Sequence, residues 1–271
     1  MPARPPIAAD GAADAGGPWA GREPLPAGPD AWYFPAAGHE EAVARMLYLV
    51  EHGRPGGVLT GVSGVGKSRL LRMAAEEAEG LRRTVVPVDL AAGDVPAAAM
   101  TACGLLPSEG ETDAGRESRL RAFLRGCQLA GRPVVVLADH ADRPAAGAAE
   151  GLTRLLHLAD ERLGGVTLVL AGESMAADVA PLAARWCELR MDVPPLTKAE
   201  TAGYLDGAAE ACGGVRFEPE AAARLHAESG GVPRRLDRAA RLAVLASMAE
   251  GRDSVAAEAV EATRAELPAA A

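Results

Sequence analysis

Residues 61–68 read GVSGVGKS, a combination of residue types and spacing that suits phosphate binding. They fit the pattern G-x-x-x-x-G-K-[ST], and an apolar segment at 57–60, expected to be a strand, runs directly into them. Glycines let backbone N–H groups point at phosphate oxygens, and the helix expected from Gly66 adds its positive N-terminal end. The motif predicts binding of ATP and Mg²⁺ by Gly61, Ser63, Gly64, Val65, Gly66, Lys67, Ser68 and Arg69.

Lys67 is one of only two lysines among 28 basic residues, and it occupies the motif position that requires a compact ammonium. We expect Lys67 to reach the β- and γ-phosphates and the Ser68 hydroxyl to bind Mg²⁺. The alternative is a glycine-rich turn that only caps a helix.

A second motif follows about 70 residues later, where Asp139 comes directly after the apolar segment VVVLA at 134–138. Proteins with a phosphate loop hold Mg²⁺ with a carboxylate at the end of a neighbouring strand, which makes Asp139 the expected metal-side ligand. A helix cap or turn is the alternative role. The next residue, His140, lacks the carboxylate that would polarise water. Either His140 replaces the base, or Asp142 assists, or hydrolysis is slow, or His140 is a surface residue without a catalytic role.

The hydrophobic pattern alternates strands with helices, which predicts an α/β fold with a parallel sheet sandwiched between helices, as in P-loop NTPases. After Pro195 only helices are expected. We predict a disordered Pro/Ala/Gly-rich tail at 1–30, a nucleotide-binding domain at 31–195 and a small all-helical domain at 196–267. Strands are expected at 57–60, 84–90, 133–138, 166–171 and 187–193, and helices at 39–52, 66–80, 96–103, 117–129, 148–162, 198–211, 218–228, 233–248 and 254–266.

The charge and the cysteine content of the chain indicate which kinds of binding partner and which cellular compartment to expect. A net charge of −9 and a pI near 5.2 argue against sequence-independent binding of nucleic acid over a broad surface, although they are compatible with a local basic face. The four cysteines are widely spaced, so neither a disulfide framework nor a zinc site is expected, and a cytoplasmic location fits. No apolar run reaches membrane-spanning length, and no signal peptide is evident.

Residues 31–267 resemble the AAA+ ATPases of the ExeA (general secretion pathway protein A) type, whose relatives include transposition accessory ATPases. The resemblance departs from the family pattern at His140, where the family has Glu, and at Glu173, where it has a polar amide. It rests on both phosphate-side motifs and on the opening YFP and HEEA (33–35, 39–42), LVLAGES (168–174), VPPLTKAETAGYL (193–205) and SGGVPRRLDRAARLAVLAS (229–247).

The resemblance also implies roles for residues outside the two motifs. Glu173 or Ser174, at the end of the strand between the phosphate motifs, would be the sensor near the γ-phosphate. Arg234 or Arg235 would reach the phosphates from the helical lid as the second sensor. Arg185, or failing it Arg190, would be an arginine finger toward a neighbouring subunit. Tyr33 and Phe34 would either stack near adenine or pack the N-terminal segment.

The function expected from these features is ATP binding and hydrolysis that drives conformational change in a partner or assembly. The alternative is a nucleotide-dependent switch or scaffold with little or no hydrolysis, because His140 stands where Glu is usual. Self-association or a protein partner is expected. A DNA-associated role like that of the transposition relatives would need a basic face, which the acidic total does not indicate.

Overall fold

The protein is described by a computed structural model in residues 25, 32–106, 110–159, 165–211 and 215–263. The predicted tail at 1–30, Leu25 apart, lies outside these residues. The chain forms two compact units: a sheet unit (Pro35–Thr197 and Gly230–Arg235) and a helical unit (Met1–Phe34, Lys198–Ser229 and Leu236–Ala271). Within the described part of the chain, no helix is both long and apolar enough to cross a membrane.

The sheet unit is built on five strands in the order β2-β3-β4-β1-β5, and all four pairings are parallel. This confirms the predicted parallel sheet. It also places β4 between β1, which enters the phosphate loop, and β3, which ends in Asp139. The strands are β1 (Gly56–Thr60), β2 (Thr84–Asp89), β3 (Val134–Asp139), β4 (Val166–Gly172) and β5 (Leu189–Asp192).

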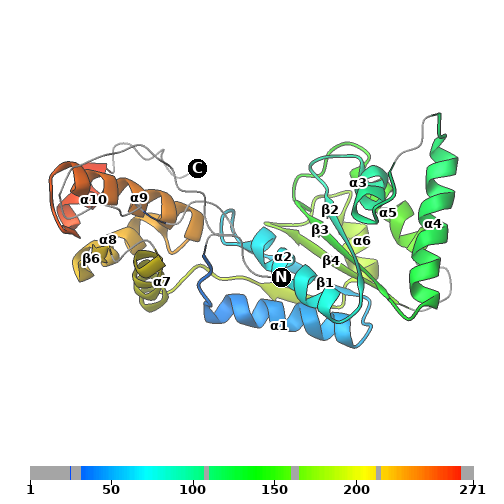
Figure 1. Cartoon of the computed structure of the whole chain (residues 1–271), viewed down its shortest axis with the longest axis horizontal. Helices are drawn as coiled ribbons and strands as arrows, with labels where there is room; N and C mark the ends of the chain where they lie inside the picture. The colour runs from blue at the N-terminus through cyan, green and yellow to red at the C-terminus, as the bar shows by residue number, and fades with distance from the viewer. Residues whose placement is uncertain (1–24, 26–31, 107–109, 160–164, 212–214, 264–271) are drawn as a thin grey trace, which may run out of the picture. The chain divides into compact units, whose positions relative to one another are not determined.

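Helices cover both faces of this sheet (Figure 1), because successive residues of a strand point to opposite sides. Along β3, Val135 and Leu137 join the core formed with α1 and α2, whereas Val134, Val136 and Ala138 join the core of the other face. On one side lie α1 (Ala37–Glu51) and α2 (Lys67–Gly80), and on the other α3 (Val95–Ala102), α4 (Asp113–Leu129), α5 (Ala148–Ala159) and α6 (Ala180–Trp186).

Two helices of the sheet unit differ from the sequence-based expectation. Helix α4 begins at Asp113 rather than at residue 117, because the Thr112 hydroxyl caps it by accepting a hydrogen bond from the Gly115 N–H at 3.2 Å. Helix α6 was not predicted. It has only seven residues, too few to display a helical period, and its Leu182 is buried in the core.

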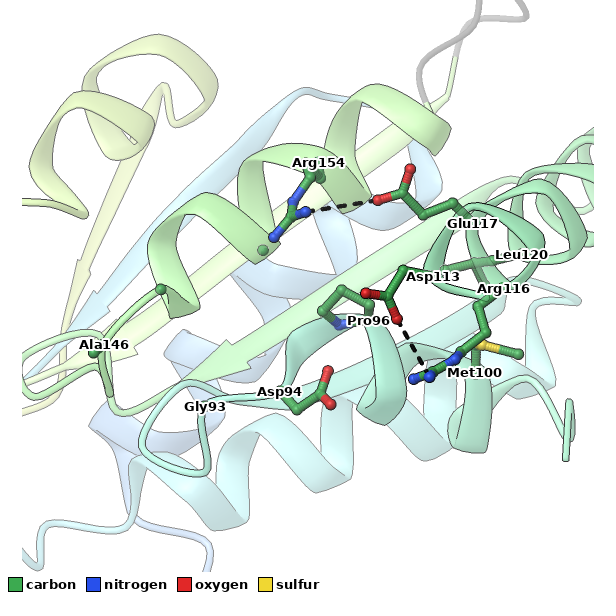
Figure 2. Close-up of a pocket in the computed structure, with 12 residues that line it drawn as sticks. Gly93, Asp94, Pro96, Met100, Asp113, Arg116, Glu117, Leu120, Ala146 and Arg154 are labelled. Atoms are coloured by element: carbon green, nitrogen blue, oxygen red, sulfur yellow. Dashed lines mark ion pairs between the residues drawn. The ribbon is translucent and has the colours of Figure 1, made fainter. Parts of the chain in front are cut away.

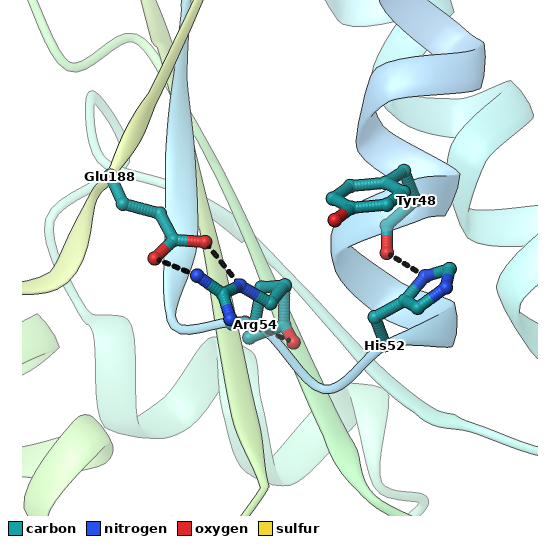
Figure 3. Close-up of polar contacts among 5 residues, drawn as sticks. Tyr48, His52, Arg54 and Glu188 are labelled. Carbon is teal, nitrogen blue, oxygen red and sulfur yellow. Dashed lines mark hydrogen bonds and ion pairs between the residues drawn. The ribbon is translucent and has the colours of Figure 1, made fainter.

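The end of the sheet opposite the phosphate loop is fastened by a forked ion pair between Arg54 and Glu188 (Figure 3). Arg54 Nε lies 2.6 Å from Oε1 and Nη2 lies 2.9 Å from Oε2 of the carboxylate. Arg54 precedes β1 and Glu188 precedes β5, so the pair joins the entries of two adjacent strands. Nearby, the rings of Tyr48 and His52 stack with centroids 4.4 Å apart.

The helical unit contains a short parallel pair, β6 (Arg216–Phe217) with β7 (Ser254–Val255). The expectation that no strand follows Pro195 was therefore wrong. Two-residue strands carry no alternation that sequence analysis could detect, and they form here because Phe217 and Val255 are both buried. The helices are α7 (Lys198–Ala211), α8 (Pro219–Ser229), α9 (Pro233–Ala249), whose first three residues belong to the sheet unit, and α10 (Ala257–Thr263).

An N-terminal aromatic segment packs on α7 within the helical unit. Trp32 and Phe34 contact the ring of Tyr204 edge-on, with centroids 4.9 Å and 6.0 Å away. Glycines make the approach possible: a Cβ at Gly207 would lie 2.5 Å from Trp32, and one at Gly203 would lie 3.2 Å from Phe34. Phe34 thus packs the N-terminal segment, which was one of its two predicted roles.

Candidate nucleotide-binding site

The phosphate loop between β1 and α2 has the backbone conformation that its glycines permit. Gly64 and Gly66 have φ of 82° and 113°, in the left-handed region that side chains disfavour. Gly64 has a second constraint, because a Cβ there would lie 2.7 Å from the Cβ of Arg234. Val65 is fully buried and anchors the loop, while Ser63 is exposed. The sequence pattern therefore produces a curled loop that opens onto the first turn of α2.

Lys67, the first residue of α2, bends back over this loop. Its Nζ donates to the carbonyl oxygens of Gly61 at 2.7 Å and Val62 at 3.2 Å. Burial lowers the pKa of Lys67, opposed by the carboxylates of Glu173, Asp142 and Asp139 in decreasing order, while the charge of Arg234 adds to the lowering. The ammonium is thus within electrostatic reach of predicted site residues at the ends of β3 and β4 and at the start of α9.

The carboxyl ends of the central strands supply these carboxylates. Asp139 ends β3, and Glu173 directly follows β4, the strand next to the phosphate-loop strand. The two strand ends are tied together, because the Ala141 N–H donates to the Ala171 carbonyl at 2.8 Å. Asp142 lies against Gly172, where an added Cβ would be 2.9 Å from Asp142 Oδ1. Glu173 itself is exposed, at the carboxyl end of the central strand β4.

His140 turns toward the other neighbour of β3. Its φ of 58° is left-handed, and its N–H donates to Asp139 Oδ1 at 2.8 Å. Its ring atom Nδ1 lies 2.7 Å from Oδ1 of Asp89, which ends β2 in register with Asp139. Because β2 and β4 flank β3 on opposite sides, the His140 ring is held on the side away from the phosphate-loop strand.

The predicted arginines occupy different surroundings. The Arg234 N–H donates to the Gly64 carbonyl at 3.2 Å, which places the start of α9 on the phosphate loop. Arg235 follows it and is exposed. Arg185, on α6, lies over the Trp186 ring at 5.9 Å from its centroid. Arg190, on β5, donates to Asp192 at 3.1 Å, which engages it within its own strand.

Mg²⁺ would be held here by Ser68 and Asp139. Ser68 is exposed in the first turn of α2, and Asp139 ends the strand two places along in the sheet. In the described residues, no three His, Cys, Asp or Glu side chains converge to hold a metal ion. This donor set fits Mg²⁺, which keeps several waters and phosphate oxygens as ligands and needs few protein groups. Arg69, also in this turn, donates its N–H to Gly66 at 2.9 Å.

Residues 50–179 match the model of a protein family described as AAA domain. The chain also superimposes on the Orc1 protein of Aeropyrum pernix, solved in complex with DNA, with a TM-score of 0.65 and 22% identity over 85% of this chain and 64% of that one. The fold is that of an AAA+ P-loop NTPase. Cdc6p of Pyrobaculum aerophilum gives a TM-score of 0.66 and 16% identity over 90% of this chain and 71% of that one.

The RuvB Holliday junction branch migration motor of Thermotoga maritima matches the same AAA+ fold, with a TM-score of 0.55 and 15% identity over 85% of this chain and 68% of that one. No curated protein matches the sequence. The chain spans less than two thirds of the Orc1 structure, and at these identities the likeness shows the fold alone. The family match and the superpositions agree on the fold of an AAA+ P-loop NTPase, while the resemblance to the ExeA type stays a prediction.

Two residues that lie close to the AAA+ site elements were not recognised from sequence as site residues. His39 in α1 is only 7% exposed, and its ring lies 3.5 Å from the position of a Cβ on Gly66. It was noted only as part of the HEEA opening. Asp89, the partner of His140, carried the same signal as Asp139, since an acidic residue ends each apolar strand.

A cavity of about 360 Å³ lies apart from the phosphate loop, among α3, α4 and α5 (Figure 2). Two ion pairs line it, Arg154 with Glu117 at 3.7 Å and Arg116 with Asp113 at 3.3 Å. Its lining residues follow β2 and β3 or belong to the three helices. The phosphate loop therefore lies at the β1–β4 side of the sheet and this hollow at the β2–β3 side.

Proposed function

We propose that the protein binds ATP with Mg²⁺ and hydrolyses it to change the conformation of a partner or an assembly. The position of Lys67 carries this proposal, because its ammonium bonds to the carbonyls of a curled phosphate loop, where the charges of three carboxylates and of Arg234 act on it. Residues 31–195 would form the nucleotide-binding domain and residues 196–267 the lid of an ATPase of the ExeA type, in the cytoplasm.

The chemistry of the site follows from the groups in place. Lys67 would exchange its bonds to the Gly61 and Val62 carbonyls for bonds to phosphate oxygens. The N–H groups of the loop and of the first turn of α2 would bind the remaining phosphate charge. Bound Mg²⁺ would neutralise charge that develops on the phosphates, held by Ser68 and Asp139. Arg234 would serve as the second sensor, since its backbone already bonds to Gly64.

The partner is proposed to be a protein, including a second copy of this chain. Arg185 would act as an arginine finger in such an assembly, because it is exposed on α6 rather than engaged with the loop of its own subunit. A net charge of −9 favours a protein partner over nucleic acid, although the solved Orc1 relative is bound to DNA.

Binding of a fluorescent ATP analogue to Lys67→Ala tests the proposal. Charge-assisted hydrogen bonds contribute roughly 1.5–3 kcal/mol each, so affinity should fall by roughly 10- to 100-fold or more. Lys198→Ala is the matched control, because Lys198 is the only other lysine and is exposed at the start of α7. Unchanged affinity in a folded Lys67→Ala protein would overturn the assignment of the phosphate loop.

A nucleotide-dependent switch with little hydrolysis is the second candidate, favoured by one observation. The His140 ring is bound to Asp89, so His140 offers no free base toward the phosphate loop. In this case the wild type would retain ATP uncleaved, and His140→Glu would accelerate turnover. General-base assistance contributes roughly 10²–10⁴-fold, which a single-turnover measurement detects even in part.

A further inference from the structure

The position directly after Asp139, at the end of β3, carries no carboxylate that could act on water at the phosphates. His140 occupies the position after Asp139, and its ring nitrogen is 2.7 Å from Asp89. The left-handed backbone of His140 and its N–H bond to Asp139 fix this orientation. The His140 ring therefore lies on the β2 side of the site.

The tip of β4 carries a carboxylate instead. Glu173 directly follows β4, which is hydrogen-bonded to the phosphate-loop strand β1 along its whole length, from Gly56 with Leu168 to Thr60 with Gly172. Glu173 is exposed, and of the three carboxylates that act on the Lys67 ammonium it acts most strongly. A carboxylate therefore directly follows the strand that neighbours the phosphate-loop strand.

We infer that Glu173 is the general base of ATP hydrolysis, rather than a polar sensor of the γ-phosphate. This inference rests on the proposed ATPase function. A water oxygen bonds to the γ-phosphorus while the bond from this phosphorus to the β–γ bridging oxygen breaks, and the electron pair of the broken bond stays on ADP. Glu173 takes the proton that the water loses and later releases it to solvent.

Asp142 is the competing carboxylate, and its surroundings make it the weaker candidate. Its Oδ1 lies against the main chain at Gly172, 2.9 Å from where a Cβ of that residue would stand, so this oxygen is packed beside the link between the strand ends. Glu173 has one more methylene and no such packing constraint at the exposed end of β4.

Glu173→Gln tests the inference, because the amide keeps the shape of the side chain and removes the base. Three readouts are needed: affinity for ATP, turnover, and the chemical identity of the nucleotide recovered from the protein after incubation. Affinity should stay within about 3-fold, turnover should fall roughly 10²–10⁴-fold, and the recovered nucleotide should be ATP rather than ADP. Glu173→Asp should recover part of the turnover, since it restores a carboxylate, and Glu150→Gln, at an exposed position of α5, is the control.

The possible results separate the inference from the function on which it rests. If the wild type converts ATP to ADP and Glu173→Gln does so at the same rate, or if Asp142→Asn is the variant that retains ATP, Glu173 is not the base. A Glu173→Gln protein that loses affinity as much as turnover also overturns the inference, because the residue would then act in binding. If the wild type binds ATP and never forms ADP, the hydrolysis in the proposed function is itself refuted.

Discussion

Gly64→Ala probes the contact between the phosphate loop and the start of α9. Its φ of 82° is disfavoured for alanine, and the added Cβ would lie 2.7 Å from the Arg234 Cβ and 3.3 Å from Val232. A left-handed backbone costs roughly 1–2 kcal/mol for a residue with a side chain. Overpacking a close contact costs roughly 1–3 kcal/mol more. The substitution should therefore destabilise the protein by about 2–5 kcal/mol.

Gly53→Ala is the matched control, because Gly53 also has a positive φ, of 59°, but nothing lies within 4 Å of the added Cβ. It should show only the backbone cost. The difference between the two variants, about 1–3 kcal/mol, corresponds to roughly 2–12 °C in the midpoint of thermal unfolding for a protein of this size.

Hydrogen exchange provides a second measurement, since the Arg234 amide bonds to the Gly64 carbonyl. That amide should exchange faster in Gly64→Ala than in Gly53→Ala. Equal unfolding midpoints together with equal exchange at Arg234 would refute the packing of residues 232–234 against the loop.

Three other predictions concern the arginines and two partly buried thiols. Arg234→Ala should lower turnover while Arg235→Ala stays near wild type, because the charge of the Arg234 side chain acts on Lys67; equal turnover in both variants would exclude the second-sensor role. Arg185→Ala should leave ATP affinity intact and lower turnover per subunit only at concentrations where the protein self-associates, which a concentration series of both proteins checks. Burial raises the pKa of Cys103 to about 11 and that of Cys187 to about 12, so at pH 7.5 both thiols should resist maleimide in native protein and react in urea, as mass spectrometry of the peptides would reveal.

Sequence predicted the parts of the site that depend on residues close together in the chain. The glycine spacing of the loop and the apolar runs of β3 and β4 are local signals, and both gave the correct elements. They also placed Asp139 and Glu173 at strand ends, because a strand that is buried on both faces is apolar throughout and its first polar residue marks its end.

The surroundings of His140 could not be predicted in the same way. Its partner Asp89 lies 51 residues away, and the two meet only because β2 is the neighbour of β3. Strand order depends on how the connecting helices pack, which a local pattern does not encode. The contact of Arg234 with Gly64 joins residues that are 170 positions apart, and it could not be predicted from the sequence for the same reason.

The aromatic segment on α7 has a consequence for the order of events on the ribosome. Tyr204 follows Phe34 by 170 residues, so at roughly 5–20 residues per second it emerges about 8–34 s after the rings that it will cover. Most of the sheet unit, residues 35–197, is complete before then. Until α7 has been synthesised, Trp32 and Phe34 therefore lack the surface around Gly203 and Gly207 on which they pack. During this interval the two rings are exposed hydrophobic groups that chaperones can bind.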